Sequence, residues 1–277
     1  MEDLQSLLTT APATVNQAWF ASLAETLLHQ AVLVVGGEAH RLLEIEFYYH
    51  GEGHEDPFAH CDPFQKTSGL WYFHREGGEY RGGSFKGVDI SFGPEGMFGG
   101  ILIRTILKPD GDMVNGCSLC VDHMLATTNH PKIASLDGEI AGRSVWDTSS
   151  PLHLSLLDAA DSSQPIWSTA RVGLTLKRMY QNPTMPDFIM SDYRFLTQPT
   201  IPKGKVHTVV AMLKQGMSTD DIRALTRSPR KSIDRYREQF EQGQQLESFN
   251  SFRGKALKVD DLCLIHGVWH ETYGSSS

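Results

Sequence analysis

Residues 41–61 read RLLEIEFYYHGEGHEDPFAHC, and the first part of this stretch alternates between apolar and polar side chains. The odd-numbered residues from Leu43 to Tyr49 would share one face of an extended strand, and the even-numbered residues from Glu44 to His50 would share the other. Because the first face is strongly apolar, we expect this strand to lie in the central sheet. The polar loop HEDPFAH (54–60) follows and crowds the second face.

The flanking sequence predicts further strands and helices. The helical spacing of Trp19, Leu23 and Leu27 predicts a helix over residues 16–30, and the apolar run AVLVV (31–35) predicts a strand. The other predicted strands are GLWYFHR (69–75), KGVDISFG (86–93) and GGILIRTI (99–106), and we expect helices over residues 117–127 and 152–160. These elements predict an α+β fold with a mixed, mainly antiparallel β core and surrounding helices.

The character of the chain changes near residue 202, after the extended segment DFIMSDYRFLTQPTIPKGK (187–205). A helix closed by Gly216 comes first, and Ser218 and Ser228 are the expected N-caps of two further helices. This is a helix-turn-helix pattern. We therefore expect a domain over residues 1–202, a helix-turn-helix module over 203–245, and a tail over 246–277 whose strand-like residues pack on the core.

The composition is that of a globular protein and limits the classes of function. It is 40% hydrophobic and 21% charged, and no apolar run approaches the roughly 18 residues that span a membrane, so we expect no membrane contact. The acidic N-terminus is unlike a secretory signal, which favours a cytoplasmic location, associated with the nucleoid if the source is bacterial. The formal net charge of −8 argues against indiscriminate polyanion binding, so any contact with nucleic acid must come from a local basic patch.

Two groups of histidine and cysteine side chains are acceptable zinc ligands. The spacing of the first group is irregular and matches no common ligand signature, and the two halves of the second are far apart in the chain. The groups are His50, His54, His60 and Cys61, and the pairs Cys117-x-x-Cys120 and Cys263-x-x-His266. Buried cysteines that act as small hydrophobes explain the second group better, and we expect no metal and no disulfide scaffold.

Glu44 and Glu46 project from the same face of the strand, beside Tyr48. The simplest explanation of two such glutamates is a solvated strand face. The apolar opposite face and the loop that crowds the polar side favour instead a pair of carboxylates that performs acid–base chemistry.

Several segments resemble, in the same order, those of the alkyladenine (3-methyladenine) DNA glycosylase family. LLEIEFYY followed by HEDPFAH is similar to the family's Glu-x-Glu-x-Tyr strand and the Ala-His a dozen or so residues later. GVDISFG with GGILIRTILKP is similar to its central strands, which carry Asn-Ile-Ser and Leu-Leu-Arg-x-Leu-x-Pro. ARVGL (170–174) and PDFIMSDYRFLT (186–197) resemble its C-terminal Ala-Arg-Val-Gly and Arg-Phe-Tyr segments, so the resemblance covers roughly residues 30–200.

The resemblance implies a role for each matched residue. Glu46 falls on the family's general base, the carboxylate that activates water against C1′ of the flipped nucleotide. Tyr48 and His60 fall on residues that sandwich and hydrogen-bond the flipped base. The remaining assignments are Phe73 or its neighbour Tyr72 as the other stacking face, Asp89 at the base edge, Arg104 beside the base and phosphate, Glu44 as a second carboxylate, and Tyr80 or Arg81 as the residue inserted into the duplex.

The implied enzyme is a monofunctional DNA glycosylase that acts on double-stranded DNA and leaves an abasic site. Water is the nucleophile and no cofactor is needed, and no lysine lies in the matched motifs to form a Schiff base. A carboxylate beside the sugar stabilises the positive charge that develops as the bond breaks, and an aromatic slot compensates the flipped base for its lost stacking.

Asp89 stands where the family has an asparagine, and this difference bears on the substrate. An ionised aspartate only accepts hydrogen bonds, so it should prefer a base edge rich in amino donors. The difference favours a hypermodified base of phage DNA, and hence antiviral defence, over the repair of alkylated purines in host DNA. An ion pair of Asp89 with Lys86 or Arg104 would explain the same residue without a change of substrate.

The helix-turn-helix segment carries a cluster of basic residues with few acids expected on the same faces. Such a helix can lie in the major groove or along phosphates, and a solvated helical bundle is the alternative. The residues are Arg223, Arg227, Arg230, Lys231, Arg235 and Arg237. The rival class of function is a non-catalytic DNA-binding regulator, whose DNA binding would survive Glu46→Gln.

Overall fold

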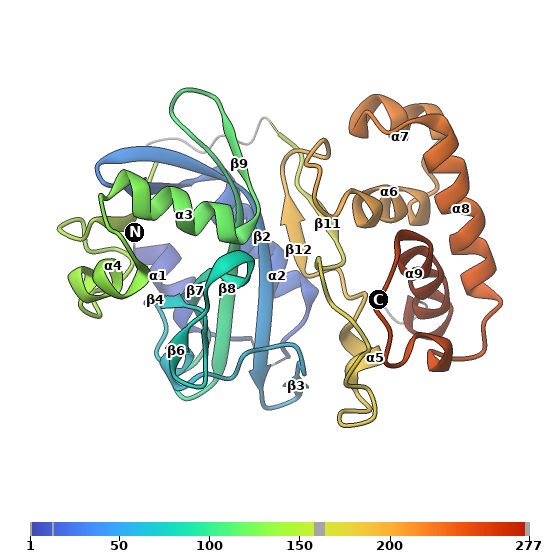
Figure 1. Cartoon of the computed structure of the whole chain (residues 1–277), viewed down its shortest axis with the longest axis horizontal. Coiled ribbons are helices and arrows are strands. Elements are labelled where there is room, and N and C mark those ends of the chain that lie inside the picture. The colour runs from blue at the N-terminus through green and yellow to red at the C-terminus, as the bar shows by residue number, and fades with distance from the viewer. Residues whose placement is uncertain (1, 13, 158–163, 275–277) are drawn as a thin grey trace. The chain divides into compact units, whose positions relative to one another are not determined.

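The strand predicted from residues 41–61 lies at the centre of the sheet (Figure 1). The strand order is β10-β1-β2-β8-β7-β4, and the pairings along this path are all antiparallel. These strands are β10 (Leu152–Leu156), β1 (Ala31–Val35), β2 (Glu38–Gly51), β8 (Phe98–Leu107), β7 (Val88–Ser91) and β4 (Trp71–Phe73). The α+β fold with a mainly antiparallel sheet is therefore confirmed.

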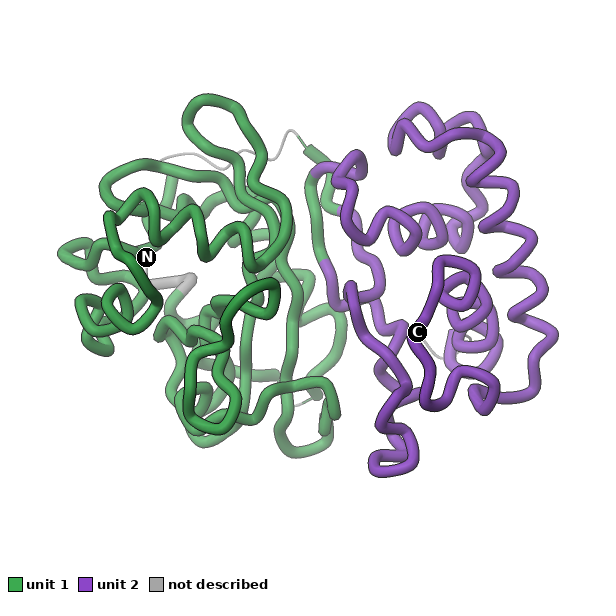
Figure 2. Tube along the Cα trace, in the orientation of Figure 1, with its two compact units in different colours: residues 1–166, 195–197 green, residues 167–194, 198–277 purple. Residues whose placement is uncertain are grey.

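The structure is a computed structural model that describes residues 2–12, 14–157 and 164–274. The chain forms two compact units, residues 1–166 with 195–197 and residues 167–194 with 198–277 (Figure 2). The first unit also contains α1 (Glu2–Thr9), α2 (Gln17–His29), β3 (His54–Glu55), η1 (Pro63–Lys66), β5 (Arg75–Glu76), β6 (Glu79–Tyr80), η2 (Gly83–Phe85), β9 (Met113–Asn115), α3 (Cys117–Thr127) and α4 (Ile133–Ile140). The second contains β11 (Trp167–Thr169), α5 (Met185–Phe188), α6 (Lys205–Lys214), α7 (Thr219–Thr226), α8 (Arg230–Gln244), η3 (Asn250–Phe252) and α9 (Val259–Tyr273), and β12 (Arg194–Leu196) has residues of both units.

The apolar face of β2 packs on α2, as the alternation of its residues predicts. The ring of Phe47 stacks on Phe20 with centroids 5.0 Å apart, and Tyr49 meets Trp19 edge-on at 5.4 Å. Each such side chain contributes about 1.5–3 kcal/mol when it is fully buried. This packing fixes which side of β2 faces the core, so it also fixes the side on which the glutamates lie.

Helix α3 was also predicted correctly, over residues 117–127, and it packs against β8. Its first residues follow β9, and the backbone N–H of Gly116 donates to the carbonyl of Arg104 at 2.7 Å. Gly116 has a φ of 121°, a conformation that favours glycine, so the chain can turn sharply from the strand into the helix here.

Helices α6, α7 and α8 have the expected helix-turn-helix arrangement. The side chain of Ser218 caps α7 by accepting from the backbone N–H of Asp221 at 3.1 Å, which confirms this N-cap. Arg227 ends α7 in the left-handed conformation, with φ 56°. A buried apolar cluster of Val209, Met212, Ile222 and Ile233 joins the helices.

Helix α9 packs along α8 through two glycines. A Cβ atom at Gly267 would lie 2.1 Å from the carbonyl oxygen of Phe240, and one at Gly243 would lie 2.2 Å from that of Leu264. Both distances are shorter than any real contact, so only glycine allows the two backbones to approach this closely. Within the described residues, no helix is both long and apolar enough to cross a membrane.

Three expectations about local structure were wrong. Residues 152–156 form β10 rather than a helix, because they pair with β1 from Leu152↔Val35 to Leu156↔Ala31; residues 158–160 lie outside the described part. The tail contains helix α9 rather than a strand, since the glycines let it pack on α8. Pro229, not Ser228, is the N-cap of α8.

The second compact unit begins at Trp167, whereas our division at residue 202 assigned residues 167–194 to the first domain. The independence of residues 203–245 as a DNA-binding module stays a prediction.

Candidate functional site

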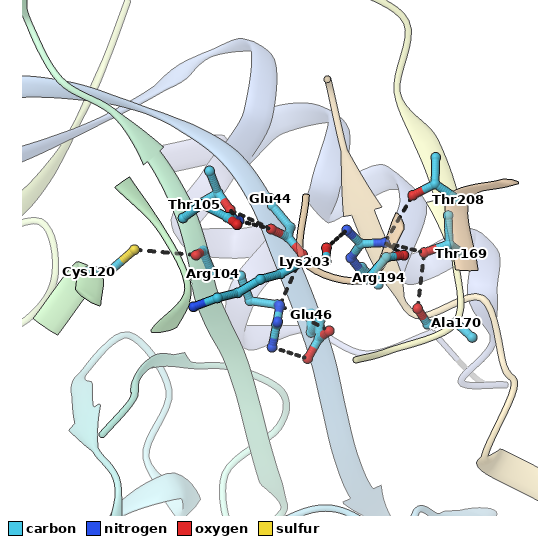
Figure 3. Close-up of polar contacts among 12 residues, drawn as sticks. Glu44, Glu46, Arg104, Thr105, Cys120, Thr169, Ala170, Arg194, Lys203 and Thr208 are labelled. Atoms are coloured by element: carbon cyan, nitrogen blue, oxygen red, sulfur yellow. Dashed lines mark hydrogen bonds and ion pairs between the residues drawn. The ribbon is translucent and has the colours of Figure 1, made fainter. Parts of the chain in front are cut away.

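Glu44 and Glu46 are completely buried, so the solvated-face explanation of this pair is wrong. Both carboxylates meet the guanidinium of Arg104 on the neighbouring strand β8 (Figure 3). The Nε atom of Arg104 lies 3.0 Å from Glu44 Oε1 and 3.2 Å from Glu46 Oε1. Buried carboxylates need such a partner, because an unpaired charge in the interior costs several kcal/mol.

The charge of Arg104 is stable in this setting. Burial by itself lowers the pKa of the guanidinium, but the carboxylates of Glu46 and Glu44 raise it by more, and the net pKa is above its ordinary value. Arg104 is therefore a permanent cation between the two glutamates.

The two glutamates have different further partners. Glu44 accepts from the hydroxyl of Thr105 and, at 3.5 Å, from the amide of Asn115. A register irregularity in β2 near Glu44 brings both Arg104 and Thr105 against it. Glu46 instead accepts from the hydroxyl of Tyr48 at 2.8 Å, and Tyr48 is only half-buried. Glu44 thus anchors the cluster, and Glu46 lies next to its more accessible side.

A row of paired residues extends from Glu46 across four strands of the sheet. Glu46 pairs with Leu102, Leu102 pairs with Asp89, and Asp89 pairs with Tyr72. Residues directly opposite each other in antiparallel strands point to the same face. The structure therefore brings Glu46, Asp89 and Tyr72 to one face of the sheet, and the alternation along β4 directs Phe73 to the other.

Asp89 is paired, although not with either of the cations considered above. Its Oδ1 atom lies 2.7 Å from Nε2 of His74, and its Oδ2 atom accepts from the amide of Gln65 at 3.2 Å. Lys86 pairs with Asp122 instead, and Arg104 with the glutamates. Sequence reasoning missed His74, which follows β4 two residues after Tyr72 and is brought to Asp89 by the register of β4 and β7.

His60 and Tyr72 lie beside this pair. The imidazole rings of His60 and His74 are 4.3 Å apart between centroids, and the hydroxyl of Tyr72 is 3.4 Å from Nδ1 of His60. Burial, and then the neighbouring charge of His74, lower the pKa of His60 to about 4. His60 is therefore neutral at neutral pH. Burial also raises the pKa of Tyr72, so its hydroxyl stays protonated.

The two predicted duplex-inserting residues belong to the β5–β6 hairpin. The hydroxyl of Tyr80 donates to Asp137 at 2.5 Å, and Arg75 lies 4.3 Å above its ring. Burial and the Asp137 carboxylate raise the pKa of Tyr80 to about 12. Arg81 lies 3.7 Å from Glu76. Tyr80 is therefore held against the protein by its hydroxyl.

Phe85 in η2, which the sequence reasoning did not single out, is 73% exposed. A large apolar side chain that exposed, four to five residues beyond Tyr80 and Arg81 in the same connection between β4 and β7, is the signal that could have identified it.

Neither zinc hypothesis gains support from the geometry. Among the described residues, no group of three or more histidine, cysteine, aspartate or glutamate side chains is arranged to hold a metal ion. Cys120 is buried and lies 3.4 Å from the carbonyl oxygen of Arg104 (Figure 3), and burial raises the pKa of its thiol. Burial also raises the pKa of Cys263 to about 12. Both thiols are protonated and act as small buried groups.

The two arginines of the C-terminal matched segments, Arg171 and Arg194, are also buried. Arg194 donates to the hydroxyls of Thr169 at 3.0 Å and Thr208 at 3.2 Å (Figure 3). It ties β11 and α6 together within the second unit, so it serves the fold.

More of the basic residues of α7 and α8 are paired with acidic side chains than we expected. Arg230 pairs with Asp220, and Arg235 pairs with Asp260. Arg237 is half-buried and donates to the hydroxyl of Thr219 at 3.0 Å. The expectation of few compensating acids was therefore wrong for Arg230 and Arg235. Arg223, Arg227 and Lys231 are exposed.

Comparison with known proteins gives one relative and no functional description. No protein-family model matches the chain. The chain is 34% identical over 182 residues to a protein of Acanthamoeba polyphaga mimivirus described as "Uncharacterized protein L759", and the match covers 60% of this chain and 82% of the viral protein. At this identity and coverage, the chain belongs to the same family as that mimivirus protein.

Proposed function

We propose that the protein is a monofunctional DNA glycosylase, which flips a modified nucleotide out of the duplex, hydrolyses its N-glycosidic bond and leaves an abasic site. The observation that carries this proposal is the position of Glu46. Its carboxylate is oriented by Arg104 and Tyr48 and shares one face of the sheet with Asp89 and Tyr72.

The chemistry of base removal requires what this carboxylate can supply. Positive charge develops on the sugar as the bond to the base breaks, and an ionised carboxylate beside C1′ stabilises that charge. The same carboxylate accepts a proton from the attacking water. Arg104 and Tyr48 orient Glu46 by donating hydrogen bonds to its carboxylate.

The burial of Glu46 adds a requirement. Its carboxylate has no exposed surface in the protein without DNA, so the flipped nucleotide must open a path to it. Half-buried Tyr48 covers Glu46 through its hydroxyl and would be the first residue to move. A site that excludes water until the substrate arrives also strengthens the electrostatic effect of the carboxylate.

The aromatic residues near this face would receive the base. A flipped base loses a few kcal/mol of stacking, which contacts with Tyr48, Tyr72 and His60 would replace. His74 and Gln65 bind the two carboxylate oxygens of Asp89, so pairing within the protein explains this residue without a change of substrate. We keep a hypermodified base of foreign DNA as the first candidate substrate, and an alkylated purine of host DNA as the second.

Phe85 fits the insertion into the duplex better than Tyr80 or Arg81. Architectural proteins and base-flipping enzymes insert apolar side chains between base steps, and Phe85 is exposed, whereas the hydroxyl of Tyr80 is bound to Asp137. Phe85→Ala should weaken base release from duplex DNA more than from single-stranded DNA, where no stack has to be filled.

The decisive experiment is a base-release assay with Glu46→Gln. Wild-type protein is incubated with alkylated DNA, unmodified DNA and phage DNA that contains glucosylated hydroxymethylcytosine, and released bases are identified by mass spectrometry. Glu46→Gln keeps the size and the hydrogen-bond acceptor but cannot take a proton, so it should abolish release. Glu55→Gln, at an exposed position of β3, is the matched control. Absence of free base from all three DNAs with wild-type protein would refute the proposal.

We further propose that α7 and α8 bind the DNA backbone. Lys231 occupies the first turn of α8, where positive charge opposes the helix dipole and is unfavourable without an anionic partner. In helix-turn-helix proteins this end of the second helix meets the DNA. Lys231→Gln should lower DNA affinity and reduce the slope of log K against log salt by about one, whereas Lys255→Gln, whose lysine is paired with Asp261, should change neither.

The same variants distinguish the glycosylase from the rival function, a DNA-binding regulator without catalysis. A regulator would bind one DNA sequence far more tightly than others, and Glu46→Gln would leave both its binding and its output unchanged. The glycosylase would bind DNA with little sequence preference and lose its product in Glu46→Gln.

A further inference from the structure

His74 and Asp89 form an aspartate–imidazole pair on the same face of the sheet as Glu46. The Nε2 atom of His74 lies 2.7 Å from Asp89 Oδ1, and the two side chains are 11% and 3% exposed. Gln65 donates to the other carboxylate oxygen of Asp89. Within the described residues, Nδ1 of His74 has no hydrogen-bond partner, so the outer nitrogen of the imidazole is open.

Two glycines make room for this arrangement. A Cβ atom at Gly100 would lie 2.4 Å from Asp89 Oδ2 and 2.6 Å from the amide nitrogen of Gln65. A Cβ atom at Gly87 would lie 2.5 Å from the imidazole of His74. Neither glycine has a positive φ, so neither is needed for the backbone. The space they leave is occupied by the aspartate, the amide and the imidazole, so a side chain at either position would displace part of the pair.

The charged and titratable groups around His74 define its role. The Asp89 carboxylate on β7 lies against Nε2 of His74, and His60, in the loop before β4, carries a positive charge only below its lowered pKa. His60 is neutral near pH 7, and Tyr72 on β4 keeps its proton. The charges of Arg81 and Asp62 act on the neighbouring His60 with opposite signs. His74 is thus the ionisable imidazole of this cluster that has a carboxylate partner.

We propose that His74 is the catalytic group that protonates the departing base, with Asp89 as its positioning residue, and that the substrate is a base without positive charge. This inference rests on the proposed glycosylase function. An alkylated purine that already carries a positive charge leaves as a neutral molecule and needs no acid, and an imidazolium in the site would repel it. A neutral base leaves as an anion unless a proton reaches it as the bond breaks.

The step balances with groups of this chain and water. The bond between C1′ and the base nitrogen breaks, its electron pair stays on the base, and the proton on Nδ1 of the His74 imidazolium passes to the base. The oxygen of water bonds to C1′ and its proton passes to the Glu46 carboxylate. The products are the abasic sugar and the neutral base, and exchange with solvent returns a proton from Glu46 and restores that of His74.

The strand register places Glu46 two strands away from Asp89, the partner of His74. Glu46 and Asp89 occupy the same row on β2 and β7, with β8 between them, so their backbones are about 10 Å apart at two strand spacings. In glycoside hydrolases that invert configuration, the acid and the base are about 6.5–9.5 Å apart, which leaves room for a water molecule.

The experiment compares two leaving groups in one duplex sequence. Hypoxanthine is the neutral probe and 7-methylguanine the cationic probe, and phage DNA with glucosylated hydroxymethylcytosine is a second neutral probe. In His74→Gln, the ratio of neutral to cationic base release should fall by on the order of 10²–10⁴-fold, the usual contribution of a general acid. His130→Gln is the matched control and should change neither rate, because the imidazole of His130 contacts the exposed Glu139.

The pH profile supplies a second readout that a merely structural role would not change. Release of a neutral base by wild-type protein should decline as pH rises through the pKa of the acid, and His74→Gln should lose this decline. Asp89→Asn removes the charged partner of His74, so it should change the pH at which this decline occurs. Thermal unfolding establishes that each variant is folded.

The outcomes separate this inference from the function on which it rests. If wild-type protein releases bases but His74→Gln reduces both rates equally, or if only 7-methylguanine is released, His74 is not the acid and the glycosylase function stands. If wild-type protein releases no base from any of these DNAs, the glycosylase function and this inference fall together.

Discussion

The polar face of the sheet buries its charged side chains, whereas the helices α6 to α9 keep their arginines and lysines at least partly exposed. On the sheet, the side chains of Glu44, Glu46 and Arg104 are buried against one another, and so is Asp89 beside His74. In the described part of α6 to α9, the buried side chains are apolar, small and hydroxylated, or imidazoles, and the arginines and lysines keep at least part of their surface exposed.

The buried charges of the sheet carry an energetic cost that the exposed charges of the helices do not. A buried ion pair adds little to stability compared with well-packed apolar residues, because both charges must leave water. Stability alone therefore does not explain the sheet's arrangement, and the proposed glycosylase would need charges held in fixed positions. The surface charges of the helices cost little and remain available to a partner in solution.

The largest expected effect is that of removing the cation from the sheet. Arg104→Ala would leave two buried carboxylates without their guanidinium, and breaking a buried pair in this way costs about 3–5 kcal/mol. We expect urea unfolding to show a loss of stability of that size in the first unit. Lys108→Ala, just after the end of the same strand, removes a half-buried lysine that pairs with exposed Asp110, and should cause no measurable change. Equal stability of the two variants would mean that Arg104 does not compensate the two buried glutamates as its contacts indicate.

The second effect lies between α8 and α9. In an ordinary helix, glycine to alanine stabilises by about 0.5–1 kcal/mol, and Gly138→Ala in α4, where a Cβ meets nothing within 4 Å, should do so. Gly267→Ala places its Cβ 2.1 Å from the Phe240 carbonyl oxygen. It should therefore destabilise by about 1–3 kcal/mol, the usual cost of overpacking. Differential scanning calorimetry of both variants would test this, and a stabilising Gly267→Ala would contradict the close approach of the helices.

A structural feature could be predicted from the sequence when it depended on residues that are close together in the chain. The alternation from Leu43 to Tyr49 predicted the orientation of β2 and the shared face of Glu44 and Glu46, because strand periodicity is a local property. The stretch from Leu152 also alternates, but a short apolar run fits either a helix or a strand, and its pairing with β1 decided the outcome.

For the same reason, contacts between residues far apart in the chain could not be predicted from the sequence. Nothing adjacent to Asp89 marks His74 as its partner, because the pairing arises from the antiparallel register of β4 and β7. The burial of Glu44 likewise depends on Arg104 and Thr105, about sixty residues away. The helix α9 requires Gly243 and Gly267 to face each other, which composition alone does not indicate.

A third effect should appear when the pH falls. His266 on α9 is buried, with its Nε2 atom 2.9 Å from Nδ1 of His207, and burial, followed by the charge of His207, lowers its pKa well below the ordinary value. Below about pH 6.5 the unfolded chain binds a proton that the folded chain rejects, so stability falls with decreasing pH, by about 1.4 kcal/mol per unit for one such group.

Amide hydrogen exchange in α6 and α9 would measure this loss in the full chain. His266→Gln removes the titrating group, so its exchange rates in these helices should depend less on pH over the same range. If the wild-type protein and His266→Gln show the same pH dependence, the imidazole is not kept neutral by the fold.

The smallest effect concerns the exposed ion pair of Arg235 and Asp260, which bridges α8 and α9. Both side chains are substantially exposed, at 60% and 38%, so solvent and salt screen their attraction. Arg235→Gln should therefore leave the urea midpoint unchanged at both low and high salt, in contrast to Arg104→Ala. A clear, salt-sensitive loss would show that surface charge contributes to the helices' stability, and the contrast with the sheet would then be one of degree. If no such loss occurs, Arg235 does not contribute to the stability of the fold. A reduced salt dependence of DNA binding in Arg235→Gln would then indicate that this charge contacts the DNA.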